Sequence, residues 1–283
     1  MTMTRSRKHR FSWKPATDPA AAVSSAQRSF LRRYRMHRRF VSISRILLLV
    51  IFLSVWEFTS SHQIIDSFIF SSPSGIARCF FSMAADRSIF RHLGVTLYET
   101  LVSFFLVTFF SVLAAVLLWF SKKLSEILEP YLVVLNSLPK SALAPLLIVW
   151  LGATRTTIIV AGMSVAIFGS ILNLYTSFMT TDPGKMTLIY TLGGKHRDVL
   201  TKVVLPSSIP AILSNMKVNI GLCLVGVVIG EFLAAREGLG YLIIYSSQIF
   251  QMNVLLMSIV LLCIMAMGLY AVVSHWVSHW GRG

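Results

Sequence analysis

The stretch Asp182–Pro210, DPGKMTLIYTLGGKHRDVLTKVVLPSSIP, is a polar segment that separates two long apolar runs. Asp182 is a favourable helix N-cap, because its carboxylate can accept a hydrogen bond from a free backbone N–H group, and Pro183 suits the first helical position. These two residues predict a helix that begins after Asp182 and runs to about Leu192. The polar segment therefore opens with a well-defined helix start.

The same stretch contains a predicted turn and a second predicted helix. Gly193-Gly194 would end the first helix, since glycine tolerates the left-handed backbone of a sharp turn. The second helix would cover about 195–204 and stop at Leu205-Pro206, because proline cannot donate the next backbone hydrogen bond. We call this predicted helix–turn–helix of residues 182–206 the knob.

The composition around the knob is that of a membrane protein. Of the 283 residues, 55% are hydrophobic and only 13% are charged, whereas about a quarter of a soluble domain is charged. The apolar runs are long enough for helices to cross about 30 Å of hydrocarbon. We therefore predict an all-α integral membrane fold with about six transmembrane helices, at residues 42–59, 94–120, 131–151, 157–179, 212–234 and 251–274.

The positive charge is concentrated at the N-terminus. The formal net charge is +15, and 11 of the 26 Lys and Arg residues lie in residues 1–40. A basic segment directly before a membrane span is a topology signal and binds anionic lipid head groups. The segment carries no folded RNA-binding signature, which favours lipid over nucleic acid as its partner. The sequence thus predicts a disordered, basic cytoplasmic tail at 1–40 and a transmembrane domain at 41–283.

The remaining charges predict the orientation of the chain. With the tail inside, six spans place both termini in the cytoplasm. Twenty Lys and Arg residues then lie on the cytoplasmic side and five on the outer side, as the positive-inside rule requires. The knob and a short loop at 121–130 are expected in the cytoplasm, and a loop at 234–244 is expected outside.

Motifs for catalysis and metal binding are missing from the sequence. Gly194-Lys195 is not part of a GxxxxGK[ST] phosphate loop, and HExxH, CxxC and GxSxG do not occur. His275 and His279 have the i, i+4 spacing of metal ligands. They lie beside Trp276 and Trp280 at the end of an apolar run, where an aromatic belt at the lipid interface is the better interpretation. We expect no catalytic residue, no metal site and no enzyme.

A few polar positions could line a path through the membrane. The third predicted span, 131–151, is interrupted by Pro139 and Pro145, and broken membrane helices are tolerated where they line a cavity or pack within protein. Lys140 lies between the two prolines, and Glu231 lies late in the fifth span. Buried charges in membranes usually face a cavity or a partner, so these four residues are candidates for a translocation path; each could equally stabilise helix packing.

Two further glutamates have a structural interpretation. Glu57 and Glu99 are expected close enough to span ends for their carboxylates to reach the membrane interface, where a charge remains hydrated. We therefore expect neither to take part in a site.

The knob resembles the cytoplasmic coupling loop of ABC importer permeases. That loop has Glu-Ala-Ala, three residues, Gly, nine residues and then Ile-x-Leu-Pro. Here nine residues separate Gly193 from Val203-Val204-Leu205-Pro206, whereas Thr187-Leu188-Ile189 stands in place of Glu-Ala-Ala. Thr187 carries no carboxylate, so it cannot form a salt bridge of the kind that the family glutamate can form. By this resemblance the residues that contact the ATPase are Asp182, Pro183, Thr187, Gly193, Gly194, Leu205 and Pro206.

Three other segments make the resemblance more specific and extend it over about 65–275. SSPSGIARCFF (71–81), LNSLPKSALAPLLIVWLG (135–152) and GVVIGEFLAAREGLGYLI (226–243) are similar to the sulfonate, nitrate and taurine branch of these permeases. The same group includes permeases for thiamine-precursor pyrimidines. The basic tail is outside the resemblance.

The resemblance implies a fold and a set of partners. It implies the type I ABC importer permease fold in a bacterial plasma membrane, a second permease copy, two cytoplasmic ATPases that bind ATP and Mg, and an external substrate-binding protein. This chain itself would bind no cofactor. Its function would be ATP-driven import of a small solute, for example an anion such as a sulfonate, taurine or nitrate. Alternatively the solute would be a thiamine-precursor pyrimidine or a similar small heterocycle.

Two other classes of function are compatible with a multi-span protein. One is a non-transporting membrane scaffold or sensor for an ATPase. The polar break at Pro139 and the outer GLGY sequence at 238–241 favour a transport path over that function. The other is an ion-driven carrier that works alone. Such carriers often contain paired half-repeats; we find no internal repeat, and the knob would have no role.

Overall fold

The computed structural model describes residues 25–280. The chain divides into two compact units, whose described parts are residues 25–58 and 59–280. The described part of the first unit belongs to helix α1, Ser25–Ser61, whose segment Ile43–Ser61 is apolar enough to cross a membrane. Residues 25–40 are thus helical where a disordered tail was expected. Arg, which occurs six times there, is a good helix former and continues the apolar helix upstream. Residues 1–24 of the predicted tail lie outside the described residues.

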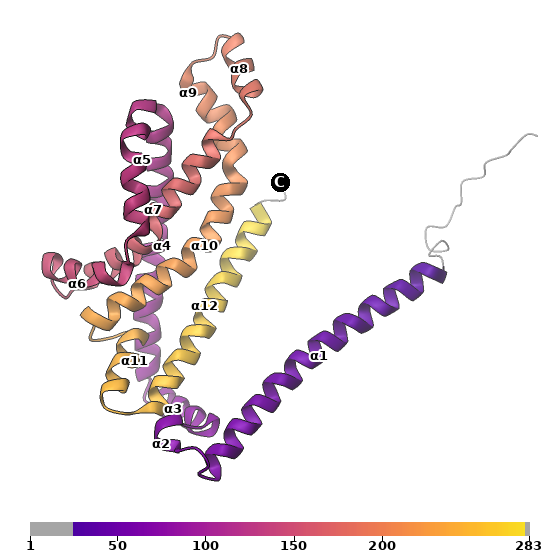
Figure 1. The fold of residues 1–283 in the computed structure, drawn as a ribbon, viewed down its shortest axis with the longest axis vertical. Coiled ribbons are helices and arrows are strands. Elements are labelled where there is room, and N and C mark those ends of the chain that lie inside the picture. Colours follow the sequence, from indigo (N-terminus) through magenta and orange to yellow (C-terminus); the bar gives the residue numbers. More distant parts are fainter. Residues whose placement is uncertain (1–24, 281–283) are drawn as a thin grey trace, which may run out of the picture. The chain divides into compact units, whose positions relative to one another are not determined.

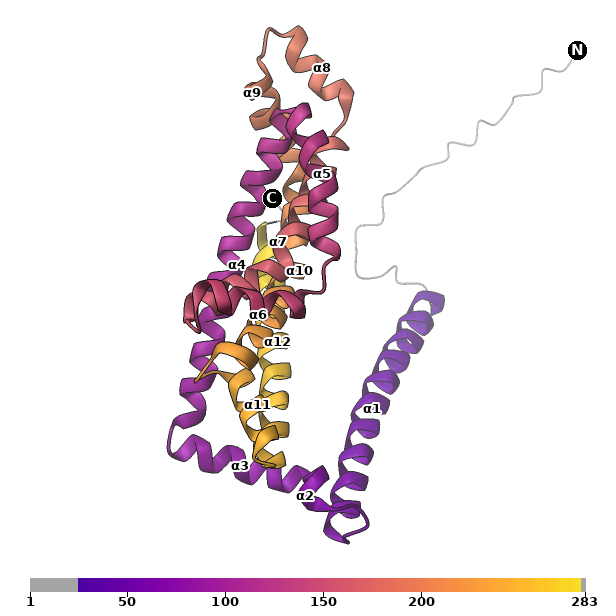
Figure 2. The ribbon, with the colours of Figure 1, turned by 60° about the vertical axis from the view of Figure 1, so that its left-hand side comes forward.

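The second unit consists of helices throughout its described part (Figures 1 and 2). Among the described residues, five helices are long and apolar enough to span a membrane, and one of them is the Ile43–Ser61 segment of α1. The number is six if the bent pair α5–α6 is counted as one span. This confirms the predicted fold class. The elements of the second unit are α2 (Ser67–Phe70), α3 (Pro73–Ala85), α4 (Ser88–Phe120), α5 (Lys122–Ser137), α6 (Lys140–Leu151), α7 (Arg155–Met179), α8 (Pro183–Thr191), α9 (His196–Val199), the π-helical turn η1 (Leu200–Val204), α10 (Leu205–Ala234), α11 (Leu239–Gln248) and α12 (Met252–Trp280).

Helices α4, α7 and α10 form the centre of this unit, and small residues let them approach closely. A Cβ atom added to Gly226 on α10 would lie 2.8 Å from the Cα atom of Gly162 on α7. Membrane helices associate through such close contacts, because lipid leaves little hydrophobic driving force between them. A polar contact adds to the packing, since Asn215 and Asn219 donate hydrogen bonds to the buried hydroxyl of Ser170, over 2.5 and 3.0 Å.

The third predicted span is bent far more than its prolines suggest. Helices α5 and α6 meet at an angle of 100°, and α6 lies across the direction of α5 (Figure 2). The prediction of a loop at 121–130 is wrong, because α5 begins at Lys122 and Ser121 alone separates it from α4. The Ser121 hydroxyl accepts a hydrogen bond from the Leu124 N–H over 3.3 Å and caps the new helix. Pro139, where the backbone turns, precedes the first residue of α6.

The loop expected at 234–244 is also largely helical. Helix α11 begins at Leu239, directly after Gly238, whose backbone has φ = +114°. Only glycine adopts such a conformation without strain, so the chain can reverse there and start a new helix at once. The knob lies at one end of the unit, and α3 and α11 lie towards the other end (Figure 1).

Candidate functional site

The first arm of the knob is helix α8, as the sequence predicts. The Asp182 carboxylate accepts a hydrogen bond of 2.8 Å from the Gly184 N–H, and Pro183 occupies the first helical turn. The Thr187 hydroxyl donates to the Pro183 carbonyl over 2.9 Å. Thr187, at the position of the family glutamate, is therefore bonded within its own helix and makes no link across the knob.

The turn of the knob depends on two glycines in different ways. Gly193 has φ = +82°, in the left-handed region that favours glycine. Gly194 donates its N–H to the Ile189 carbonyl over 2.9 Å, and an added Cβ would lie 2.5 Å from the Ile189 side chain. The first glycine thus supplies the backbone conformation, and the second supplies the space for the closed turn.

The second arm differs from the prediction, because it does not stop at Pro206. Helix α9, the π-turn η1 and helix α10 run without a break over His196–Ala234. The Leu205 N–H bonds to the Leu200 carbonyl five residues earlier, so the turn is wider than an α-turn. A widened turn moves the preceding carbonyls away from the proline ring and accommodates the missing donor. The knob is therefore continuous with a membrane helix.

A stack of aromatic rings joins the knob to the end of α4. The imidazole of His196 lies parallel to the indole of Trp119, with ring centroids 4.3 Å apart, and the Tyr190 hydroxyl is hydrogen-bonded to its Nδ1 atom over 2.7 Å. Below the stack, Val199 and Val204 are fully buried against residues of α4 and α7. Sequence reasoning missed Trp119 and His196; the signal was an aromatic residue at a span end and a histidine just after the glycine turn.

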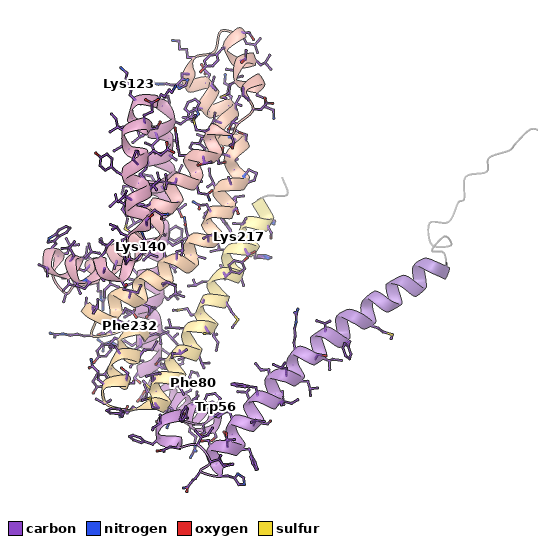
Figure 3. The ribbon with its side chains drawn as sticks, in the orientation of Figure 1. Trp56, Phe80, Lys123, Lys140, Lys217 and Phe232 are labelled. Carbon is purple, nitrogen blue, oxygen red and sulfur yellow. The ribbon has the colours of Figure 1, made fainter. Side chains whose placement is uncertain are left out.

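Lys140 lies at the junction of α5 and α6 (Figure 3). Its ammonium group donates hydrogen bonds to the carbonyls of Leu135 (2.7 Å) and Asn136 (2.9 Å) and lies 5.5 Å from the centre of the Phe168 ring. Carbonyls at a helix C-terminus lack partners in their own helix, so Lys140 caps α5. Pro139 and Pro145 are both exposed within this unit.

Glu231 lies at the other end of the unit and is fully buried. Its carboxylate accepts hydrogen bonds from the Thr96 hydroxyl and the Gly240 N–H, both over 2.6 Å. Thr96 in turn accepts the Leu239 N–H over 2.8 Å. Glu231 therefore connects α10 with α4 and with the turn before α11. The structure brings none of the other predicted path residues to it.

Glu99 differs from the sequence prediction, since its side chain is enclosed by protein and is not exposed to solvent. Helix α4 begins at Ser88, well before the predicted span start, so Glu99 lies inside the bundle and is fully buried. Its carboxyl group lies within hydrogen-bonding reach of Glu231. Neither of its oxygens accepts a hydrogen bond from an N–H or O–H group of the described chain.

The turn between α10 and α11 is held to α4 and α7 by ion pairs. Glu237 contacts Arg91 from α4, and its other oxygen lies 3.3 Å from Arg155 at the start of α7. His92 accepts a hydrogen bond of 3.0 Å from the Gly238 N–H. Within residues 25–280, no group of three or more His, Cys, Asp or Glu side chains is arranged to hold a metal ion.

Comparison with known proteins gives a consistent family and fold. Residues 107–280 match the family described as the binding-protein-dependent transport system inner membrane component. The chain is 23% identical over 247 residues to the putative aliphatic sulfonates transport permease protein SsuC of Bacillus subtilis, with 87% of this chain and 90% of that protein covered. It is 25% identical over 206 residues to the formylaminopyrimidine transport permease protein ThiX of Halalkalibacterium halodurans, with 73% and 82% covered.

A solved structure shares the fold. A chain of the MetNI methionine ABC transporter in an inward-facing conformation superposes with a TM-score of 0.61 and 19% sequence identity, covering 69% of this chain and 97% of that chain. At this level of identity the match establishes the arrangement of helices and says nothing about the solute.

Proposed function

Because this chain belongs to the family of binding-protein-dependent transport system inner membrane components, the permease subunits of ABC importers, we propose that its knob receives motion from a separate ATPase and transmits it to the membrane helices. The chain is a non-catalytic, multi-pass membrane subunit. The observation that carries the proposal is the unbroken helix His196–Ala234, which joins the knob directly to a membrane span.

The surface of the knob suits a docking role. On α8 and the turn after it, Leu188 is 58% exposed and Leu192 is 75% exposed. Large apolar side chains gathered on a short polar segment indicate a contact with another protein. Asp182, Pro183 and Thr187 shape this arm, Gly193 and Gly194 shape the turn, and Leu205 and Pro206 continue into α10. We assign these seven residues to ATPase coupling.

The mechanical argument follows from stiffness. When two ATPase subunits bind ATP and Mg and close on each other, a knob bound to each of them must move with it. A flexible knob would absorb that movement, whereas an arm continuous with α10 and packed on α4 and α7 carries it to the spans. ATP and Mg belong to the partner ATPase, and this chain needs no cofactor for that role.

The partners and topology complete the proposal. An external substrate-binding protein delivers the solute, and a second copy of this chain provides the other half of the path. Both termini and the knob lie in the cytoplasm of a bacterium, and the basic residues 1–40 contact anionic lipid head groups. The positive-inside distribution of Lys and Arg supports this orientation.

The bent segment and the buried carboxylate support a path. We assign Pro139, Lys140, Pro145 and Glu231 to its walls. Lys140 would act there mainly by holding the sharp bend between α5 and α6, because its ammonium group is bonded to two carbonyls. The small solute would be a sulfonate, taurine or nitrate, as the relation to SsuC supports. A thiamine-precursor pyrimidine is the alternative, which the relation to ThiX supports.

A reconstituted complex tests the coupling role. The permease, its ATPase and its binding protein are placed in proteoliposomes, and ATP hydrolysis and uptake of the partner protein's solute are measured together. Gly193→Val forces a β-branched residue into the left-handed region, so we expect uptake to fall while ATP hydrolysis continues. Gly193→Asn is the matched control, since asparagine tolerates that region.

Two outcomes of this experiment would contradict the proposal. Full uptake by Gly193→Val would show that the turn does not transmit force. ATPase binding without ATP-dependent uptake of any solute by the wild-type complex would favour the membrane scaffold or sensor.

A further inference from the structure

A small cavity opens beside the turn that precedes α11. Its volume is about 270 Å³, and its walls come from the early part of α4, the start of α7 and the residues after α10. Four charged side chains line it: Glu99, Arg155, Arg236 and Glu237. The early part of α4 and the turn between α10 and α11, whose residues line the cavity, lie away from the knob within this unit, on its outer side in the proposed orientation (Figure 1).

Glu99 is the polar group of this cavity that lacks a donor. It is fully buried, and neither oxygen of its carboxylate accepts a hydrogen bond within the described chain. Its neighbour Glu231 is satisfied by Thr96 and by the backbone N–H groups of Gly240 and Tyr241. Burial of an ionised carboxylate without a partner costs several kcal/mol. An ionised Glu99 therefore requires a donor or a positive charge that the described residues do not supply.

The cationic side chains around the cavity do not fill this need. Arg155 pairs with Glu237 over 3.3 Å, and Arg91 pairs with the same carboxylate. Arg236 lines the cavity but makes no bond to Glu99. A bound metal ion would also be a poor partner for Glu99, because no third His, Cys, Asp or Glu among the described residues lies with Glu99 and Glu231 to complete a metal site. For an ionised Glu99 the missing partner is therefore a group that enters the cavity from outside.

We propose that Glu99 binds a nitrogen-bearing group of the transported solute, either an ammonium group or the N–H edge of an aminopyrimidine, as the solute passes the outer end of the path. This inference rests on the proposed function and specifies its substrate class. Two free carboxylate oxygens match two N–H donors on one edge of a ligand, and a charge-assisted pair of this kind is strong in a site shielded from water.

The remaining charges of the cavity refine the class. A plain anion such as nitrate or an alkanesulfonate would be repelled by an ionised Glu99 in the cavity wall. A zwitterion such as taurine is compatible, because its ammonium group can contact Glu99 while Arg155 or Arg236 faces its sulfonate. An aminopyrimidine is compatible through its N–H groups alone. The cavity thus selects among the solutes that the two relatives suggest.

Direct binding to the permease–ATPase complex in lipid nanodiscs tests this inference without the binding protein, which would otherwise impose its own selection. The probes are taurine, ethanesulfonate, which lacks the amine, and 4-amino-5-hydroxymethyl-2-methylpyrimidine. We expect taurine or the aminopyrimidine to bind at least about tenfold more tightly than ethanesulfonate, since a hydrogen bond to a charged group is worth more than a factor of ten. Glu99→Gln should abolish that difference. Glu126→Gln, at an exposed acid on α5, is the matched control and should leave it unchanged.

Several results would overturn the inference. They are equal binding of ethanesulfonate, no binding of either nitrogen-bearing probe to the wild type, or unchanged binding by Glu99→Gln. In that case infrared spectroscopy tests the alternative role, in which Glu99 shares a proton with Glu231. A band of a protonated carboxyl group that is present in the wild type and absent from Glu99→Gln would assign this role, provided that the variant binds the probes as the wild type does. ATP-driven uptake by the reconstituted transporter would persist in each of these cases, whereas its absence from the wild type would count against the proposed function itself.

Discussion

The imidazole of His196 lies flat against the indole of Trp119, with ring centroids 4.3 Å apart and an interplanar angle of 8°. The two residues come from different parts of the chain: Trp119 is near the end of α4, and His196 opens the second arm of the knob. Tyr190 from the first arm lies parallel to the same imidazole. One histidine of the second arm thus contacts both a membrane helix and the first arm of the knob.

We predict that His196→Ala weakens coupling by the knob. The substitution removes a ring stack of about 1 kcal/mol and the hydrogen bond to Tyr190, so the two arms can move relative to α4. In proteoliposomes that contain the ATPase and the binding protein, the number of ATP molecules hydrolysed per solute imported should rise several-fold. Binding of the ATPase should persist, because the exposed residues of α8 are unchanged.

Two variants separate the ring stack from the hydrogen bond. His196→Phe keeps an aromatic ring on Trp119 and should retain most of the coupling. Tyr190→Phe removes the hydroxyl alone and should have a small effect. An unchanged ratio of ATP to solute in His196→Ala would show that burial of Val199 and Val204 is sufficient to hold the knob.

The local features of the knob could be predicted from sequence, whereas its attachment could not. Asp182, Pro183 and Gly193 act through backbone rules that involve only neighbouring residues, and the structure has the predicted helix and turn. The predicted helix stop at Pro206 is wrong because the same rules say nothing of a π-turn, which depends on the packing of the whole second arm. The stack on Trp119 needs two segments far apart in the chain, and no local pattern specifies it.

At the outer end of the second unit, too, the sequence predicts single residues of interest but not the contacts that they make. The sequence marks Glu231 as a buried charge, but its partners come from α4 and from the turn after α10. The sequence predicts a span that begins at residue 94 and so places Glu99 near the interface, whereas α4 begins at Ser88 and Glu99 is buried. Gly238 and Gly240 are typical of a loop, so the sequence predicts no helix there, whereas α11 starts directly after Gly238 and Gly240 approaches Glu231.

Pro206 gives a prediction that differs from the one its sequence context suggests. A helix stop would make Pro206→Ala lengthen the second arm and disturb coupling. In the structure the helix already continues through this position, and Pro206 is exposed. Pro206→Ala restores a backbone donor, so we expect uptake within about twofold of the wild type and thermal stability that is unchanged or higher. Loss of uptake would show that the π-turn, which the proline maintains, is itself needed for coupling.

Two glycines on α10 give a matched test of helix packing. A Cβ atom on Gly226 would lie 2.8 Å from the Cα atom of Gly162 and 2.9 Å from the Ala161 carbonyl, whereas a Cβ on Gly221 meets nothing within 4 Å in the described chain. Gly226→Ala should force α7 and α10 apart and cost about 1–3 kcal/mol. Gly221→Ala should be neutral or slightly stabilising. Thermal unfolding of the purified permease in detergent measures both, and equal effects would contradict the close approach at Gly226.

The buried carboxylate of Glu231 gives the last prediction, because each of its two oxygens already accepts a hydrogen bond from a neighbouring donor. Glu231→Gln keeps the shape but turns one acceptor oxygen into an NH2 group, which then faces the Thr96 hydroxyl or the Gly240 N–H. A lost bond to a charged group costs about 2 kcal/mol, so the turn before α11 should open more often. Hydrogen exchange of the 236–245 backbone should become faster, while exchange in the knob stays unchanged as an internal control. Glu126→Gln should alter neither region. Exchange at wild-type rates in Glu231→Gln would mean that the ion pairs of Glu237 with Arg91 and Arg155 hold this turn without the buried carboxylate.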